Sequence, residues 1–230
     1  MLLYAVVLVI VTVSEQPPDS GGAATLQYVE AHRTVYIIRQ VLWQAPGLFM
    51  MVVILALAVA LRRYGPSLAG IAGMLGVSSW AISFAWPTTG DGSLAMVLLS
   101  DRYADATTAA ERASMVAGAD LLNALNTMPA VIGVLQTLGV LLIALLMLRG
   151  PFGPALAWLG VATGAIGIAS EIFRPVLGWA YAVYGLLLFV WLAWVAVALW
   201  RFAETVRTSS TVTEAPGGAR TEGKRLREQT

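Results

Sequence analysis

Apolar stretches of membrane-crossing length alternate with short polar breaks along most of this chain. An α-helix rises about 1.5 Å per residue, so about 20 apolar residues cross the roughly 30 Å hydrocarbon core of a bilayer. Five stretches meet this length: Trp43–Leu61, Leu68–Trp86, Pro129–Leu148, Pro154–Phe173 and Val176–Trp200. We therefore predict an all-α fold, a polytopic transmembrane helix bundle with five clear spans.

The segment Met1–Val13 is also apolar, but as a helix it would extend only about 20 Å. It lacks the basic start and the small-residue cleavage site of a signal peptide. It also lacks the polar face that holds a helix at the membrane interface. We expect it to be a first span that is short or that begins upstream of Met1.

Two further helices are predicted outside the hydrocarbon. Leu26–Arg39 carries apolar residues on related turns, which indicates a helix that runs along the membrane and continues into the next span. Thr107 or Thr108 can begin another helix, because Glu111 stands where a reciprocal capping carboxylate is needed. That helix should run to about Thr127.

These elements predict four regions along the chain. They are 1–13, the first span; 14–42, an outer loop with the interfacial helix; 43–200, the transmembrane bundle including the outer segment 87–128; and 201–230, a tail. The tail is rich in Thr, Ser, Gly and Arg, so we expect it to be disordered.

Composition limits the chemistry that the chain can perform. It is 58% hydrophobic and 12% charged, which is more apolar than a water-soluble domain of this size allows. The net charge of +1 gives no reason to expect nucleic acid as a partner. The chain has no cysteine and one histidine, which excludes disulfides, thiolate metal sites and histidine triads. We expect no cofactor and no bound metal.

Basic residues predict the orientation of the spans. The two shortest hairpins contain Arg62, Arg63 and Arg149 without an acidic residue, and the tail adds more arginines. Helices that alternate in direction place all of these on one side, which the positive-inside rule makes cytoplasmic. The sequence therefore predicts a multi-pass membrane protein with a cytoplasmic C-terminus.

The first candidate for a polar site is Asp120, Asn123 and Thr127, which share one helix face because they are spaced i, i+3 and i+7. A carboxylate beside an amide could bind a cation, a proton or a polar headgroup, and ionised groups at mid-membrane usually have a function. The alternative is that Asp120 lies on the wet face of an interfacial helix, since it precedes the next span by about nine residues.

Glu171 and Arg174 form the second candidate, at the outer end of the fourth clear span. They could gate or line a cavity, with Glu171 as a proton acceptor. They could equally form a helix-end pair that reaches the headgroups. If Asp120 approached Glu171, the five residues of both candidates would make one polar pocket.

Two other features allow a functional and a structural interpretation. His32 could sense pH or help to bind a metal, or it could be an exposed histidine without such a role. Gly160-x-x-x-Gly164 allows close backbone contact, either between helices of one chain or between the two chains of a homodimer.

Three runs of residues carry a resemblance to a known family: Tyr103–Asp105 with Glu111-Arg112, Pro151–Gly160 with Thr163-Gly164, and Val190–Leu192 with Leu199–Arg201. They resemble the domain-of-unknown-function 4386 family of bacterial membrane proteins, over about Gln40–Phe202. The resemblance implies about six spans, which supports a first span near Met1–Val13. The family has no assigned activity, so the resemblance implies no catalytic residue.

The sequence favours a non-enzymatic protein that binds or senses a lipid or small molecule, or supports a partner membrane protein. One alternative is a small transporter or proton-coupled permease that uses Asp120 and Glu171. A further alternative is an intramembrane lipid-modifying enzyme with the same two carboxylates as acid and base.

Overall fold

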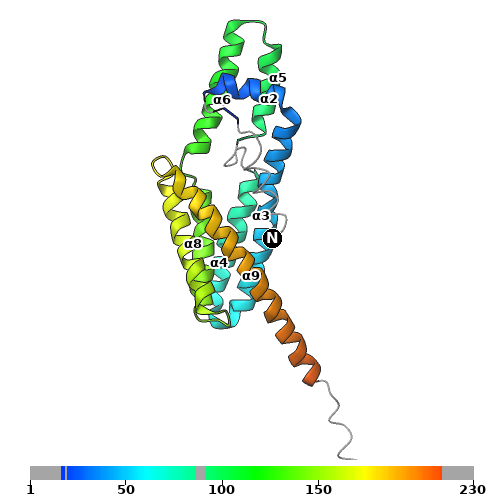
Figure 1. Ribbon diagram of the computed structural model, residues 1–230, viewed down its shortest axis with the longest axis vertical. Coiled ribbons are helices and arrows are strands. Elements are labelled where there is room, and N and C mark those ends of the chain that lie inside the picture. The colour runs from blue at the N-terminus through cyan, green and yellow to red at the C-terminus, as the bar shows by residue number, and fades with distance from the viewer. Residues whose placement is uncertain (1–16, 19, 86–91, 214–230) are drawn as a thin grey trace, which may run out of the picture. The chain divides into compact units, whose positions relative to one another are not determined.

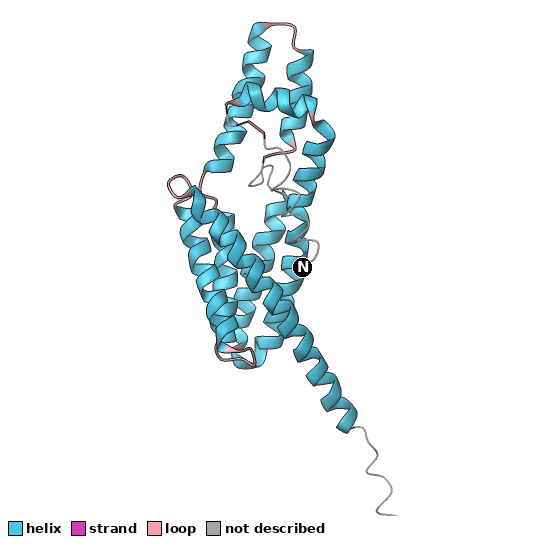
Figure 2. Ribbon diagram, viewed as in Figure 1, coloured by secondary structure: helices cyan, strands magenta, loops and turns pink. Residues whose placement is uncertain are grey.

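The computed structural model describes residues 17–18, 20–85 and 92–213, and this part of the chain is built from helices (Figure 2). The elements are α2 (Gly22–Ala31), α3 (Arg33–Leu61), the short 3-10 helix η1 (Arg62–Tyr64), α4 (Pro66–Ala85), α5 (Ala95–Asp105), α6 (Ala109–Thr127), α7 (Val131–Met147), α8 (Pro154–Ile172) and α9 (Gly178–Thr213). The predicted first span, Met1–Val13, lies outside the described residues, as does the chain after Thr213.

Within the described residues, five segments are long and apolar enough to cross a membrane, as the sequence predicts. They are Arg33–Tyr64, Pro66–Ala85, Ala109–Met147, Pro154–Ile172 and Trp179–Glu204. The third segment contains two helices, of which α6 carries charged residues and α7 carries none. The membrane-crossing part of this segment is therefore α7, and the fold is an all-α polytopic bundle.

The chain divides into two compact units, Met1–Ala193 and Trp194–Thr230, so α9 belongs to both. In the first unit, α7 packs against α4 and α8, and α4 also packs against α3 (Figure 1). In the second unit, the Trp200 indole donates a hydrogen bond to Glu204 at 2.7 Å, one turn further along the helix.

Glycines allow the bundle helices to approach closely. A methyl group on Gly139 of α7 would lie 2.9 Å from the Cα atom of Gly76 in α4, so the two backbones touch there. On α8, a methyl group on Gly164 would lie 2.8 Å from the Leu141 backbone, and Gly160 lies against the Trp191 indole. The small residues of α8 are therefore used for packing within the chain.

A second group of helices, the α2–α5–α6 cluster, packs around the start of α3. Its buried apolar residues are Leu26, Val29, Tyr36, Met96 and Ala119. Polar contacts add to this packing. The buried Ser100 hydroxyl donates a hydrogen bond to the Leu26 carbonyl at 2.8 Å. The Tyr36 hydroxyl donates one to the Ser93 carbonyl at 3.0 Å. An ion pair between Arg33 and Asp101 links α3 to α5 at the surface.

The structure differs from the sequence prediction at three elements. The helix expected over Leu26–Arg39 is interrupted at His32, whose backbone leaves the helical region (ψ 29°) between α2 and α3. The helix α5 lies in the outer segment 87–128, where the sequence predicted a helix only from Thr107 or Thr108 onward. Its buried residues Met96 and Ser100 face the α2–α5–α6 cluster, so its place depends on contacts with segments distant in the sequence.

The third difference concerns the tail. Disorder was expected from Arg201, but α9 continues to Thr213. The sequence between these positions contains no Gly or Pro to end a helix, and the hydrogen bond between Trp200 and Glu204 supports the turn that follows the apolar part.

Candidate functional site

Asp120 lies on α6 and caps the beginning of α2. The Gly22 N–H donates a hydrogen bond to the Asp120 carboxylate at 2.5 Å. The residue before α2, Gly21, has no side chain that could provide this acceptor. The first N–H groups of a helix have no partner within the helix, and a negative charge there is favourable. The carboxylate therefore supplies from another helix the cap that the local sequence lacks.

The contact also requires glycine at position 22. A methyl group on Gly22 would lie 2.5 Å from the Val116 carbonyl oxygen and 2.9 Å from the Asp120 nitrogen, both in the backbone of α6. Backbone atoms cannot move away as the end of a side chain can. The two helices thus meet through their backbones, at the point where the carboxylate is placed.

Asn123 continues the same face of α6, as its spacing from Asp120 predicts. Its amide donates a hydrogen bond to the Thr25 hydroxyl at 3.1 Å, and that hydroxyl in turn donates one to the Gly21 carbonyl at 3.2 Å. Thr127 does not join this group, because its exposed hydroxyl donates to the Ala124 carbonyl of its own helix at 2.9 Å.

Glu171 lies near the end of α8 and faces the beginning of α7. Its side chain is only 4% exposed. A methyl group on Gly133, in the first turn of α7, would lie 2.5–2.8 Å from the three carboxyl atoms of Glu171. The Ala130 N–H faces the same carboxyl group. Since α7 has no side-chain cap of its own, Glu171 occupies the position of an N-cap supplied by another helix.

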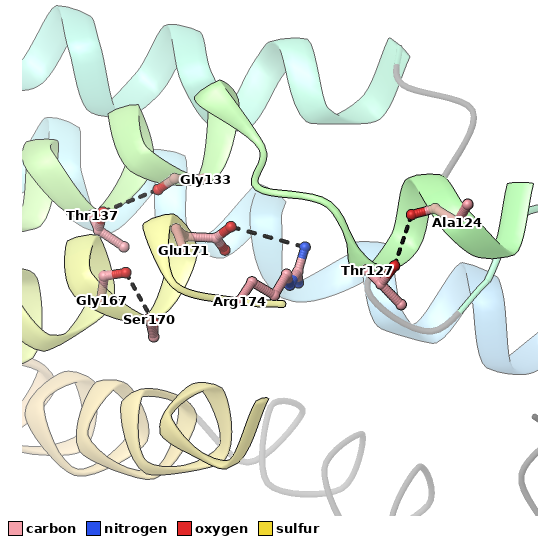
Figure 3. Close-up of polar contacts among 8 residues, drawn as sticks. All are labelled: Ala124, Thr127, Gly133, Thr137, Gly167, Ser170, Glu171 and Arg174. Atoms are coloured by element: carbon pink, nitrogen blue, oxygen red, sulfur yellow. Dashed lines mark hydrogen bonds and ion pairs between the residues drawn. The ribbon is translucent and has the colours of Figure 1, made fainter. Parts of the chain in front are cut away.

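Arg174 is the charged partner of Glu171 in the structure (Figure 3). Its guanidinium lies 3.8 Å from Glu171 Oε2 and 4.3 Å from the centre of the Tyr181 ring. The separation of 3.8 Å is too long for a hydrogen bond, and no donor reaches Glu171 Oε2 with hydrogen-bonding geometry. The Tyr181 side chain faces the same carboxyl group, so Arg174 and Tyr181 are its polar neighbours on this side.

The five candidate residues therefore form two sites rather than one. Asp120 and Asn123 contact α2, whereas Glu171 and Arg174 contact each other and the beginning of α7. In the part of the chain that the structure describes, no hydrogen bond or ion pair joins the two groups. Thr127, which Figure 3 draws with its bond to Ala124, donates this hydrogen bond within α6.

The partners of these residues could not be predicted from the sequence. Gly22, Gly133 and Tyr181 complete the two sites, but they lie far from Asp120 and Glu171 in the sequence or on another helix. One signal was present: neither α2 nor α7 begins with a residue that caps it through its own side chain, so each needs an acceptor from elsewhere.

His32 does not belong to either site. Its ring stacks on Tyr28, with 4.6 Å between the ring centres, and its Nδ1 lies 3.1 Å from the Tyr28 carbonyl oxygen. Among residues 17–18, 20–85 and 92–213, no three His, Asp or Glu side chains gather in a way that could hold a metal ion.

The fold and the two sites define a multi-pass helical membrane protein in which the exposed Asp120 carboxylate caps α2 and the buried Glu171 carboxyl group lies against the first turn of α7. Comparison with known proteins adds no narrower class, because no protein-family model, curated protein or solved structure matches the chain.

Proposed function

We propose that this chain is a non-enzymatic membrane protein whose α2–α5–α6 cluster binds a ligand or a partner membrane protein. The observation that carries the proposal is the use of Asp120. The carboxylate that the transport and enzyme hypotheses need is engaged in building the cluster, through its 2.5 Å hydrogen bond to Gly22. This hydrogen bond helps to pack α2 against α6, so the cluster is a folded unit. A segment that only connected two spans would not need such packing.

Exposed apolar side chains on the cluster support a binding role. Leu94 directly before α5 and Leu98 on α5 are 50% and 54% exposed, and Leu121 on α6 is 61% exposed. Large apolar side chains that remain exposed outside a membrane span are typical of contact surfaces when they form a patch. We propose this part of the cluster as the contact region.

The same proposal includes the orientation and the family. Arg62, Arg63 and Arg149 are exposed at hairpins on the opposite end of α3 and α7 from the cluster. The positive-inside rule then favours a cytoplasmic C-terminus and a cluster on the outer side of a bacterial cytoplasmic membrane. Membership of the domain-of-unknown-function 4386 family remains part of the proposal, supported by the residue runs described above.

Photo-cross-linking in native membranes tests the binding role. A photoreactive amino acid placed at Leu98 or Leu121 of the full-length chain should give a discrete adduct, a bound lipid or a protein of defined mass. The matched control is Ala113, an exposed residue in the polar first turns of α6. The proposal would be contradicted if no position gave an adduct. It would also be contradicted if Ala113 gave as much adduct as Leu98 and Leu121.

A second candidate function, proton-coupled transport, is favoured by Glu171 alone. Ionisable groups within spans commonly mark ion pathways, and no donor reaches the buried Glu171 Oε2 with hydrogen-bonding geometry. In purified chain reconstituted into vesicles, Glu171→Gln keeps an acceptor oxygen for α7 but cannot ionise. Proton flux down an imposed pH gradient should then be lost, whereas equal flux in both proteins would reject this candidate. The lipid-modifying enzyme needs a second carboxylate, and the described contacts of Glu171 include none.

A further inference from the structure

Three exposed arginines lie in two short hairpins of the transmembrane bundle. Arg62 and Arg63 belong to η1, between α3 and α4, and Arg149 lies in the turn between α7 and α8. The Arg63 guanidinium lies 5.0 Å from the centre of the Tyr64 ring, which holds it beside its hairpin. We refer to Arg62, Arg63 and Arg149 as the hairpin arginines.

The two hairpins pack against each other at one end of the bundle (Figure 1). A methyl group on Gly150 would lie 2.7 Å from Leu61 Cδ2, and a methyl group on Gly65 would lie 3.0 Å from Leu146 Cδ1. Leu61 directly precedes the arginines of η1, and Gly150 directly follows the arginine of the other hairpin. The contact between Leu61 and Gly150 therefore brings arginines from both hairpins together.

The hairpin arginines lie at the depth of the lipid headgroups. The apolar part of α3, the 19 residues from Trp43 to Leu61, covers about 28 Å and ends directly before Arg62. This length is close to the thickness of the hydrocarbon core. After the other hairpin, Trp158 in the second turn of α8 is 61% exposed, which is typical of a tryptophan at the boundary between hydrocarbon and headgroups. Both hairpins are therefore next to lipid phosphates.

Acidic residues do not neutralise Arg62 or Arg149 within the described residues. Neither residues 61–68 nor residues 148–154 include an Asp or Glu. In the part of the chain that the structure describes, Arg33 and Arg174 form ion pairs, whereas Arg62 and Arg149 form none. Their positive charge is therefore available to an external anion.

Two helix starts add to the positive potential at this end. The helix α4 begins at Pro66 and α8 begins at Pro154, directly after the two hairpins. Neither helix has an acidic residue in its first turn, and no side-chain hydrogen bond caps α8. The N-terminal end of a helix carries a partial positive charge that favours anions. The arginines and the helix starts therefore attract the same kind of ligand.

We infer that the hairpin arginines bind the headgroup phosphate of an anionic phospholipid. A guanidinium group donates parallel hydrogen bonds to phosphate oxygens, which makes arginine well suited to this ligand. A headgroup with a net negative charge is attracted by all three arginines, whereas the positive choline group of phosphatidylcholine offsets this attraction. The hairpins and the α2–α5–α6 cluster lie at opposite ends of α3, so lipid binding here does not depend on the function proposed for that cluster.

Native mass spectrometry of the purified full-length chain tests this site. In detergent with equal amounts of phosphatidylglycerol and phosphatidylcholine, the wild-type chain should retain phosphatidylglycerol preferentially. Arg62→Gln and Arg149→Gln should each lower this preference about fivefold, as expected for the loss of one basic side chain near an anionic headgroup. The matched control is Arg102→Gln, which changes an exposed arginine of the α2–α5–α6 cluster and should keep the wild-type preference.

Thermal unfolding in solution gives a second measurement. Added phosphatidylglycerol should raise the unfolding midpoint of the wild-type chain and of Arg102→Gln, because a ligand that binds the folded state stabilises it. In the double variant Arg62→Gln with Arg149→Gln, the midpoint in detergent alone should be unchanged and the rise should be lost. Equal retention of both lipids by the wild-type chain, or an equal loss of preference in Arg102→Gln and the hairpin variants, would overturn the site.

Discussion

The Asp120 carboxylate and the Gly22 N–H, 98 residues apart in the sequence, are joined by a hydrogen bond of 2.5 Å. This contact fixes the beginning of α2 to the middle of α6. Glu171 also faces the beginning of another helix, because its carboxyl group lies against Gly133 in the first turn of α7 and faces the Ala130 N–H. Both acidic residues that suggested ion or substrate chemistry thus lie at the beginning of a second helix.

Asp120→Ala should weaken the beginning of α2, because the Gly22 N–H loses its acceptor. Loss of an N-cap typically costs about 1 kcal/mol. Amide hydrogen exchange of Gly22–Thr25 in the lipid-reconstituted protein should become faster. Asp120→Asn is the matched control, since its amide oxygen can still accept the hydrogen bond. Unchanged exchange in Asp120→Ala would show that the contact does not stabilise α2.

Gly139→Ala should destabilise the bundle, since the added methyl group would meet the Gly76 backbone at 2.9 Å. Overpacking of this kind costs about 1–3 kcal/mol. The matched control is Gly70→Ala on α4, where no atom lies within 4 Å of the added methyl group. Thermal unfolding in one detergent should show a lower midpoint for Gly139→Ala alone. Similar midpoints for both variants would refute the backbone contact.

Gly133 and Glu171 should be energetically coupled. Gly133→Ala introduces a methyl group 2.5 Å from the Glu171 carboxyl carbon, and this clash disappears when the side chain is shortened in Glu171→Ala. A double-mutant cycle on the free energy of unfolding should therefore give an interaction of about 0.5–3 kcal/mol, with the double variant less damaged than the sum of the single ones. Additive effects would mean that the two residues do not touch.

The beginning of α6 should depend on pH through Glu111, which lies outside the membrane-spanning part of the chain. The backbone N–H groups of Thr108 and Thr107 bond to its carboxylate and lower its pKa below the usual 4.5. A lowered pKa in the folded state means that the stabilisation is complete above pH 4.5 and is lost as the pH falls through the lowered pKa.

Nuclear magnetic resonance can follow the Glu111 carboxyl and the Thr108 amide in one titration. Both signals should change together, at a pH below 4.5. In Glu111→Gln, the Thr108 amide should no longer respond in this range. A Glu111 pKa at or above 4.5 would contradict the capping box.

The sequence predicted those helices that depend only on residues close together in the chain. The five spans follow from apolar length, and α6 begins as predicted because Thr108 and Glu111 are three residues apart and bond reciprocally. The break at His32 and the short α5 were missed because packing between segments distant in sequence determines them. The Ser100 hydroxyl on the Leu26 carbonyl is one such contact.

The same distinction applies to the site. The shared face of Asp120 and Asn123 could be predicted from their spacing, and so could the pairing of Glu171 with Arg174. Their roles could not be predicted, because each depends on a glycine from another helix. Nothing in the sequence near Asp120 indicates that Gly22 lies against it, and the single pocket expected from both candidates required a proximity that spacing does not determine.

The contact between Gly76 and Gly139 also restricts how anything could permeate this bundle. Two helix backbones in contact leave no space between them for a water molecule about 2.8 Å across. A continuous aqueous route along the seam between α4 and α7 would therefore require the two helices to separate at this contact.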